Sequence, residues 1–86
     1  MRAIIFGVGY LFDLFMDVYN RECMEIIALC DNNKNIWGTE KYGIQVISPE
    51  RIDHNVDRII ITSSYYEEIR KQLERYISYN QKSGLR

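Results

Sequence analysis

The sequence predicts an α/β fold of three layers, in which a four-stranded parallel sheet with strand order 3-2-1-4 lies between helices. Two observations predict this fold. Short, continuously apolar runs, typical of strands buried on both faces of a parallel sheet, alternate with segments of helical periodicity. The first apolar run also ends in two glycines, Gly7 and Gly9, and a helical segment follows at once. Right-handed crossovers between the strands then give the expected order.

The predicted elements follow one another in a regular alternation. Strands are expected at residues 3–6, 24–30, 44–47 and 58–62, because each is a compact apolar run. Helical spacing of apolar residues predicts helices over 10–20 and from 64 to about 78, and Ser48-Pro49 opens a brief helix over 50–53. Residues 32–44 are polar and predict a loop, with room for a hairpin around Trp37. We expect one domain over residues 1–79 and a flexible tail over 80–86.

The bulk composition excludes several classes of function. The chain has 86 residues, a formal net charge of −1 and no basic block, so a nucleic-acid partner is not expected. No stretch approaches the roughly 20 apolar residues of a membrane span. The two cysteines form no C-x-x-C pair and His54 is the only histidine, so no metal site is expected. With only two cysteines, one of them inside an apolar run, a reducing, cytoplasmic location is expected.

The pair Gly7 and Gly9 is the first candidate for chemistry. Gly7 suits a tight strand-to-helix turn, and Gly9 would let phosphate approach the backbone and the first amides of the helix, that of Tyr10 included. A full dinucleotide-binding fingerprint has a small residue at position 12, where this chain has Phe12, so two-thirds of the pattern is present. The alternative is that both glycines only make a tight turn.

Asp31 is the second candidate. It lies 22 residues after Gly9, close to the spacing of a carboxylate that binds a ribose 2′-hydroxyl, and such a carboxylate favours NAD over NADP. The neighbouring Asn32 is a further candidate contact. The alternative is that Asp31 begins an Asx turn with Asn32 and Asn33, and both roles are compatible.

Two further groups of residues are candidates at the expected pocket. Thr62 and Ser63 follow the last strand and could contact a ligand, whereas Ser64 is expected to cap the next helix. Trp37 and Tyr42 could stack on a base or a sugar, but we expect them to cap the core.

Catalytic arrangements are poorly represented in the sequence. No tyrosine is followed four residues later by lysine, the pair that a short-chain dehydrogenase would use, and Tyr66 is followed by Arg70 instead. His54 lies in a polar stretch and is expected at the surface. Catalysis by this chain alone is therefore not expected.

Several segments together resemble the small Rossmann-like nucleotide-binding domain of bacterial polysaccharide biosynthesis proteins. This domain precedes sugar O- and N-acyltransferases, and it also occurs in nucleotide-sugar dehydratases of the capsule-synthesis type. The resemblance implies that Gly7, Gly9 and Asp31, with Thr62 and Ser63, contact a nucleotide, and that catalytic groups lie in other domains. The segments that carry it are Gly7-x-Gly9, Ala28-Leu29-Cys30-Asp31-Asn32-Asn33, Trp37-Gly38, Gly43-Ile44-Gln45-Val46-Ile47-Ser48-Pro49-Glu50 and Ile60-Ile61-Thr62-Ser63-Ser64.

Three hypotheses of function follow from these residues. The first is a non-catalytic module that binds NAD or a UDP-sugar and works with further domains of a longer chain or with a partner protein. The second is the cofactor-binding half of an NAD-dependent nucleotide-sugar dehydratase or epimerase. The third is an interaction domain with a relict pocket, in which Phe12 fills the phosphate site and the apolar first helix forms an interface.

Overall fold

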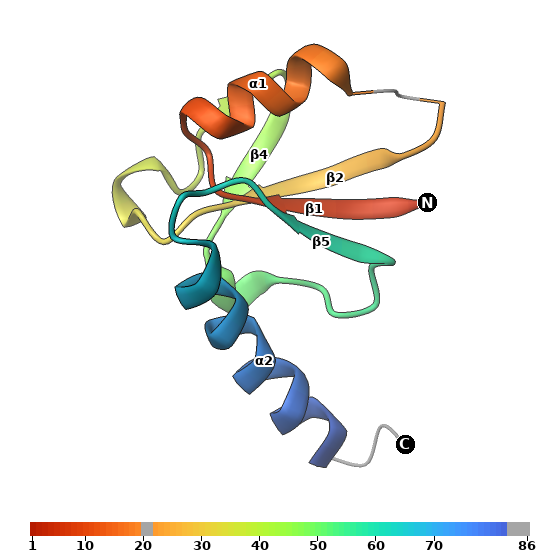
Figure 1. Ribbon diagram of the computed structural model, residues 1–86, viewed down its shortest axis with the longest axis vertical. Helices are drawn as coiled ribbons and strands as arrows, with labels where there is room; N and C mark the ends of the chain where they lie inside the picture. Colours follow the sequence, from red (N-terminus) through yellow and green to blue (C-terminus); the bar gives the residue numbers. More distant parts are fainter. Residues whose placement is uncertain (20–21, 83–86) are drawn as a thin grey trace.

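The computed structural model describes residues 1–19 and 22–82, with the backbone alone for residues 76–82. A sheet lies between two helices, α1 (Tyr10–Val18) and α2 (Tyr66–Lys82), which Figure 1 shows on opposite sides of the strands. No helix of the described residues is long and apolar enough to cross a membrane. The strands are β1 (Arg2–Phe6), β2 (Glu25–Cys30), β3 (Glu40–Lys41), β4 (Ile44–Ile47) and β5 (Arg58–Ile61), and two short 3-10 helices are η1 (Lys34–Ile36) and η2 (Pro49–Arg51).

Strand β1 lies inside the sheet and is flanked on both sides. It pairs in parallel with β2 and with β5, so that Phe6 lies opposite both Cys30 and Ile61. Strand β2 pairs in parallel with β4, through Leu29 opposite Val46. Because these strands are parallel, the carboxyl ends of β1, β2 and β5, and the loops that follow them, lie at one edge of the sheet.

The predicted four-stranded, all-parallel sheet with order 3-2-1-4 is wrong. The sheet is mixed and has five strands, in the order β3-β4-β2-β1-β5, because β3 pairs antiparallel with β4. The physical reason is the turn at Tyr42 and Gly43, whose φ angles of 55° and 76° are both positive. Two consecutive residues with positive φ form the tight turn that joins hairpin strands, and Lys41 pairs directly with Ile44 across it.

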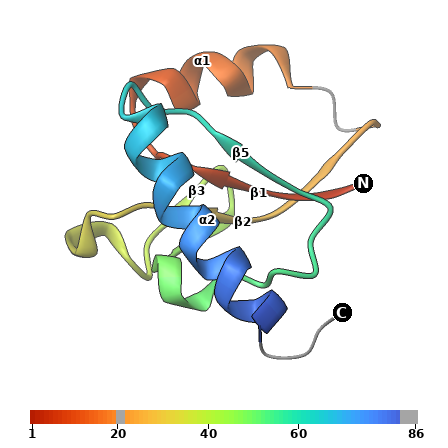
Figure 2. The same ribbon diagram turned by 60° about the horizontal axis from the view of Figure 1, so that its bottom comes forward.

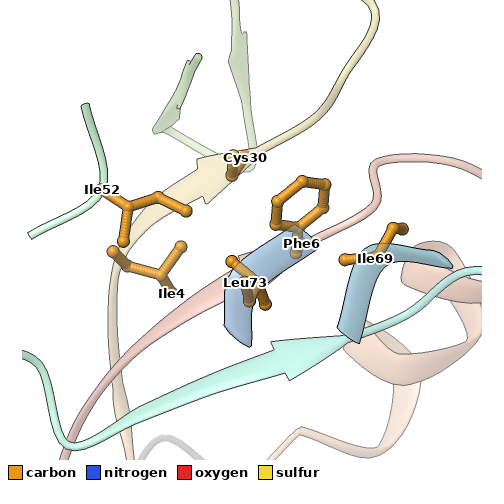
Figure 3. Packing of buried hydrophobic residues seen from close by; sticks show 6 residues of the cluster. All are labelled: Ile4, Phe6, Cys30, Ile52, Ile69 and Leu73. Atoms are coloured by element: carbon orange, nitrogen blue, oxygen red, sulfur yellow. The ribbon is translucent and has the colours of Figure 1, made fainter. Parts of the chain in front are cut away.

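Two clusters of buried side chains attach the helices to the sheet. Phe12 of α1 packs on one face, together with Ile5, Leu29 and Val46. On the other face, α2 contributes Ile69 and Leu73, which Figure 3 shows over side chains from β1 and β2. Cys30 lies in this second cluster and is fully buried, as expected for a cysteine that packs as a small hydrophobe.

The observed helix limits differ from the predicted ones. Helix α1 ends at Val18 rather than at residue 20, which lies outside the described residues. Helix α2 begins at Tyr66 and continues to Lys82, beyond residue 80, where we expected the tail to start. Residues 83–86 of the expected tail lie outside the described residues. The short helix η2 begins at Pro49 after the N-cap residue Ser48, as predicted, and ends at Arg51, two residues before the predicted end.

Candidate functional site

A solvent-open pocket of about 490 Å³ lies where two loops meet at one edge of the sheet. One loop joins β1 to α1, the other joins β5 to α2, and Figures 1 and 2 both show them side by side. Both helices begin at this edge, because each follows the carboxyl end of a strand that runs parallel to the other. The lining residues are Gly7, Val8, Gly9, Tyr10, Leu11, Asp31, Thr62, Ser63, Ser64 and Tyr65.

Gly7 is required by the packing of the two loops. Its φ of +113° is a conformation that other residues rarely adopt. A Cβ added at Gly7 would also lie 2.6 Å from the carbonyl oxygen of Thr62, which is too close for any side chain. The Gly7 N–H donates to the carbonyl of Cys30 at 2.8 Å, so this residue joins the ends of β1, β2 and β5.

Among the described residues, in contrast, no close contact requires a glycine at position 9. A Cβ at Gly9 would meet nothing within 4 Å, and its φ of −136° is not a left-handed conformation. Gly9 is the N-cap of α1 and has no side chain to accept a hydrogen bond from the helix. The first helical bond runs from the Asp13 N–H to the Gly9 carbonyl at 3.1 Å, so the earlier amides of this turn have no acceptor within the helix.

The Asp31 carboxylate forms part of the wall of the pocket. Its Oδ2 accepts a hydrogen bond from the Val8 N–H, and its Oδ1 accepts one from the Asn33 N–H, both at 2.8 Å. The second bond is the Asx turn that the sequence allowed. The Asp31 carbonyl also accepts a 2.7 Å bond from Nε1 of Trp37. A carboxylate has room for further hydrogen bonds, so Asp31 can shape the loops and still accept one from a ligand hydroxyl.

Thr62 and Ser63 form the opposite wall. The Thr62 hydroxyl donates to the carbonyl of Gly7 at 2.7 Å, across the point where the two loops are closest. The Ser63 hydroxyl accepts a 3.0 Å bond from the N–H of Tyr65, just before α2 begins. Among the described residues, therefore, Ser63 and not Ser64 supports the start of this helix.

The structure brings most of the predicted site residues together. Gly7, Gly9, Tyr10, Asp31, Thr62 and Ser63 all line the pocket. Asn32 does not, because its side-chain amide exchanges two hydrogen bonds, of 3.1 and 3.0 Å, with Gln72 of α2. Tyr65 lines the pocket, although its helical spacing from Ile69 and Leu73 predicts a place on the apolar stripe of α2. Its position before the first helical residue, Tyr66, is the signal that could have separated it from that stripe.

Phe12 lies away from the pocket. Its side chain is fully buried between α1 and the sheet, and its ring meets Tyr42 edge to face with centroids 5.7 Å apart. The ring therefore does not fill the phosphate site, as the hypothesis of an interaction domain with a relict pocket supposed. Tyr42 is more than half exposed apart from this contact, so it covers the core only in part.

The lining of the pocket offers few groups for catalysis. Among the described residues that line it there is no lysine, arginine or histidine, and Asp31 is the one acidic residue. Cys30, the residue before Asp31, is no nucleophile at neutral pH, because burial, with the nearby Asp31 charge, raises its pKa to about 12. Within the described residues, no three acidic, histidine or cysteine side chains are grouped to hold a metal ion. The polar groups that this lining offers are therefore chiefly backbone amides, hydroxyls and the Asp31 carboxylate.

Comparisons with known proteins give one match. Neither a curated protein nor a solved structure matches the chain. A family model described as C2185-like, N-terminal, matches residues 1–83, nearly the full length. The chain therefore belongs to the C2185-like, N-terminal family.

Proposed function

We propose that this chain is a non-catalytic module that binds a nucleotide or nucleotide-sugar in the pocket between the β1–α1 and β5–α2 loops. The observation that carries the proposal is the open start of α1. Gly9 has free space in front of it and the first helical amides have no acceptor within the helix, a combination that suits a phosphate group. The packing of the two loops explains the glycine at position 7, whereas no contact between described residues uses the free space at Gly9.

The charges of the pocket favour one orientation of such a ligand. The Val8 N–H is already bonded to Asp31, so the phosphate would use the later amides, from Gly9 onward. The positive end of the helix dipole would favour the phosphate there, while the negative Asp31 would favour a ribose hydroxyl instead of a second anion. This arrangement supports NAD or a UDP-sugar over a ligand with a 2′-phosphate.

The resemblance of the sequence to nucleotide-binding domains of polysaccharide biosynthesis supports the choice of ligands. We place the module in the bacterial cytoplasm, acting with catalytic domains of a longer chain or with a partner protein. The pocket lining has no acid–base pair, so a dehydratase or epimerase half would need all its catalytic groups from elsewhere.

An interaction domain is the second candidate function, and one observation favours it. Tyr10, Leu14 and Val18 recur every four residues on α1 and are 75%, 45% and 80% exposed. Such a row is a larger apolar surface than a single exposed side chain. The burial of Phe12 removes the other argument for this function, namely a filled phosphate site.

Calorimetric titration with UDP-N-acetylglucosamine, UDP and NAD⁺ tests the proposed function. We expect saturable binding of at least one ligand, and we expect Gly9→Leu to weaken it at least about tenfold, the equivalent of about 1.4 kcal/mol. Val18→Ala, at the far end of the same helix, is the control and keeps the affinity. Equal affinity of Gly9→Leu and the parent chain, or no binding of any ligand at millimolar concentration, contradicts the proposal.

A further inference from the structure

A second pocket, of about 460 Å³, lies beside the carboxyl end of β4 and shares no lining residue with the first. One wall comes from the end of the loop between β2 and β3, yellow in Figure 1, and the other from β4 and η2. Four residues with polar or aromatic side chains line this space, and none of them belongs to the proposed nucleotide site. They are Trp37, Gln45, Ser48 and Arg51.

The Ser48 hydroxyl is the most unusual of these groups. Ser48 is 8% exposed and occupies the N-cap position of η2, yet its side chain makes no capping bond. No other hydrogen bond involves this hydroxyl among the described residues. In the same part of the chain, every fully enclosed polar side-chain atom has a partner. The Ser48 hydroxyl is therefore not fully enclosed, and Ser48 lines the pocket, where a ligand could satisfy this group.

Trp37 provides a fixed aromatic surface in the same pocket. Its Nε1 donates to the Asp31 carbonyl at 2.7 Å, which holds the indole in one orientation. The residue is nevertheless 40% exposed, although we expected it to cap the core. An aromatic ring that is held in place and remains open on one side can stack against another ring with little loss of conformational entropy.

Arg51 and Gln45 supply hydrogen-bonding groups without partners of their own. The ion pairs among the described side chains involve Arg2 and Arg70 and leave the exposed Arg51 guanidinium unpaired. The exposed Gln45 amide makes no side-chain hydrogen bond within the same residues. A guanidinium binds carboxylate and phosphate groups through paired hydrogen bonds, and an amide adds one donor and one acceptor.

We propose that this pocket binds a small ring compound that carries an acidic group, either a carboxylate or a phosphate. The ring lies on the exposed side of Trp37, the anion pairs with Arg51, and Ser48 and Gln45 bond to ring hydroxyl groups. This site goes beyond the proposed function and does not depend on it, because the two pockets have separate linings.

The test uses the fluorescence of Trp37, the one tryptophan of the chain. Glucuronate and glucose 6-phosphate probe the two acidic groups, and glucose and inorganic phosphate probe the ring and the anion alone. We expect a saturable change in emission with glucuronate or glucose 6-phosphate. The affinity for glucose alone or for inorganic phosphate alone should be at least about tenfold lower. The preferred acidic ligand distinguishes a carboxylate from a phosphate site.

Variants connect this response to the pocket. We expect Arg51→Gln to weaken binding about tenfold and Ser48→Ala about threefold to tenfold, since a bond to a charged group is the stronger one. Arg58→Gln, which removes an exposed arginine at the start of β5, leaves the affinity unchanged, and so does Gly9→Leu in the first pocket. No saturable change with either acidic ligand at millimolar concentration, or equal affinity of Arg51→Gln and the parent chain, overturns the proposal.

Discussion

The N–H of Val8 donates a 2.8 Å hydrogen bond to Oδ2 of Asp31, a residue 23 positions further along the chain. This bond joins the turn after β1 to the end of β2. The other carboxylate oxygen holds the N–H of Asn33, so a single side chain shapes both loops. Asp31 is therefore a structural residue of the pocket wall as well as a candidate ligand contact.

Replacement of this carboxylate should destabilise the fold. In Asp31→Asn, one of the two oxygens becomes an NH₂ group, which cannot accept a bond from either amide. We expect the free energy of unfolding to fall by about 1–3 kcal/mol, the usual cost of a lost partner. Asp17→Asn, an exposed change on α1, should stay within about 0.5 kcal/mol. Urea denaturation measures both, and equal stability of the two variants would show that the Asp31 bonds contribute nothing.

Gly7 and Gly43 both have positive φ and should differ in their tolerance of alanine. Gly7→Ala places a Cβ 2.6 Å from a backbone oxygen, whereas Gly43→Ala meets nothing within 4 Å. Both changes incur the cost of positive φ, about 1–2 kcal/mol, and only Gly7→Ala adds a collision with the backbone. We expect Gly7→Ala to lose about 3 kcal/mol or more, or to fail to fold. A thermal unfolding comparison in which Gly7→Ala is the milder change would contradict the observed loop geometry.

Phe12 should be among the most sensitive positions of α1. Phe12→Ala opens a cavity beneath the helix and removes the edge-to-face contact with Tyr42, so we expect a loss of about 3–5 kcal/mol. Leu11→Ala, at a partly exposed neighbour, should cost less than about 1 kcal/mol. Denaturation of the two variants checks this difference. Similar losses would mean that Phe12 is not in the core.

Cys30 should make stability depend on alkaline pH. Its pKa is raised from 9.0 to about 12 in the folded chain, so the thiol ionises first in the unfolded chain. The stabilising effect is complete below pH 9 and is lost as the pH rises toward 12, at up to about 1.4 kcal/mol per pH unit. Stability measured against pH should fall less steeply in Cys30→Ala than in Cys23→Ala, whose substituted thiol is exposed. Parallel profiles of stability against pH for the two variants would contradict the raised pKa of Cys30.

The apolar runs predicted the positions of four strands well, because a buried strand needs a continuous apolar segment. The fifth strand escaped prediction because β3 has two exposed, charged residues and is held only by its pairing with β4. The turn that creates it uses Tyr42 at positive φ, where asparagine or glycine would have been the recognisable signal.

The candidate site could be predicted in part. The spacing of Gly7, Gly9 and Asp31 in the sequence was enough to predict that they lie in one pocket, since the loops that follow parallel strands meet at one edge of the sheet. The pairing of Asn32 with Gln72 could not be predicted, because it joins residues 40 positions apart through exposed side chains. The fixed orientation of Trp37 likewise depends on a backbone carbonyl, which no sequence pattern identifies.

An amide-resolved NMR titration of the chain with NAD⁺, UDP-N-acetylglucosamine and UDP tests the proposed nucleotide site most directly. The account predicts saturable shifts that cluster at the amides of residues 9–12 and 63–65 and at Asp31, with the largest shifts at the start of α1. The absence of shifts at millimolar ligand would contradict it. Shifts that cluster on the exposed row of Tyr10, Leu14 and Val18, with none in the loop that contains Ser63, would contradict it as well.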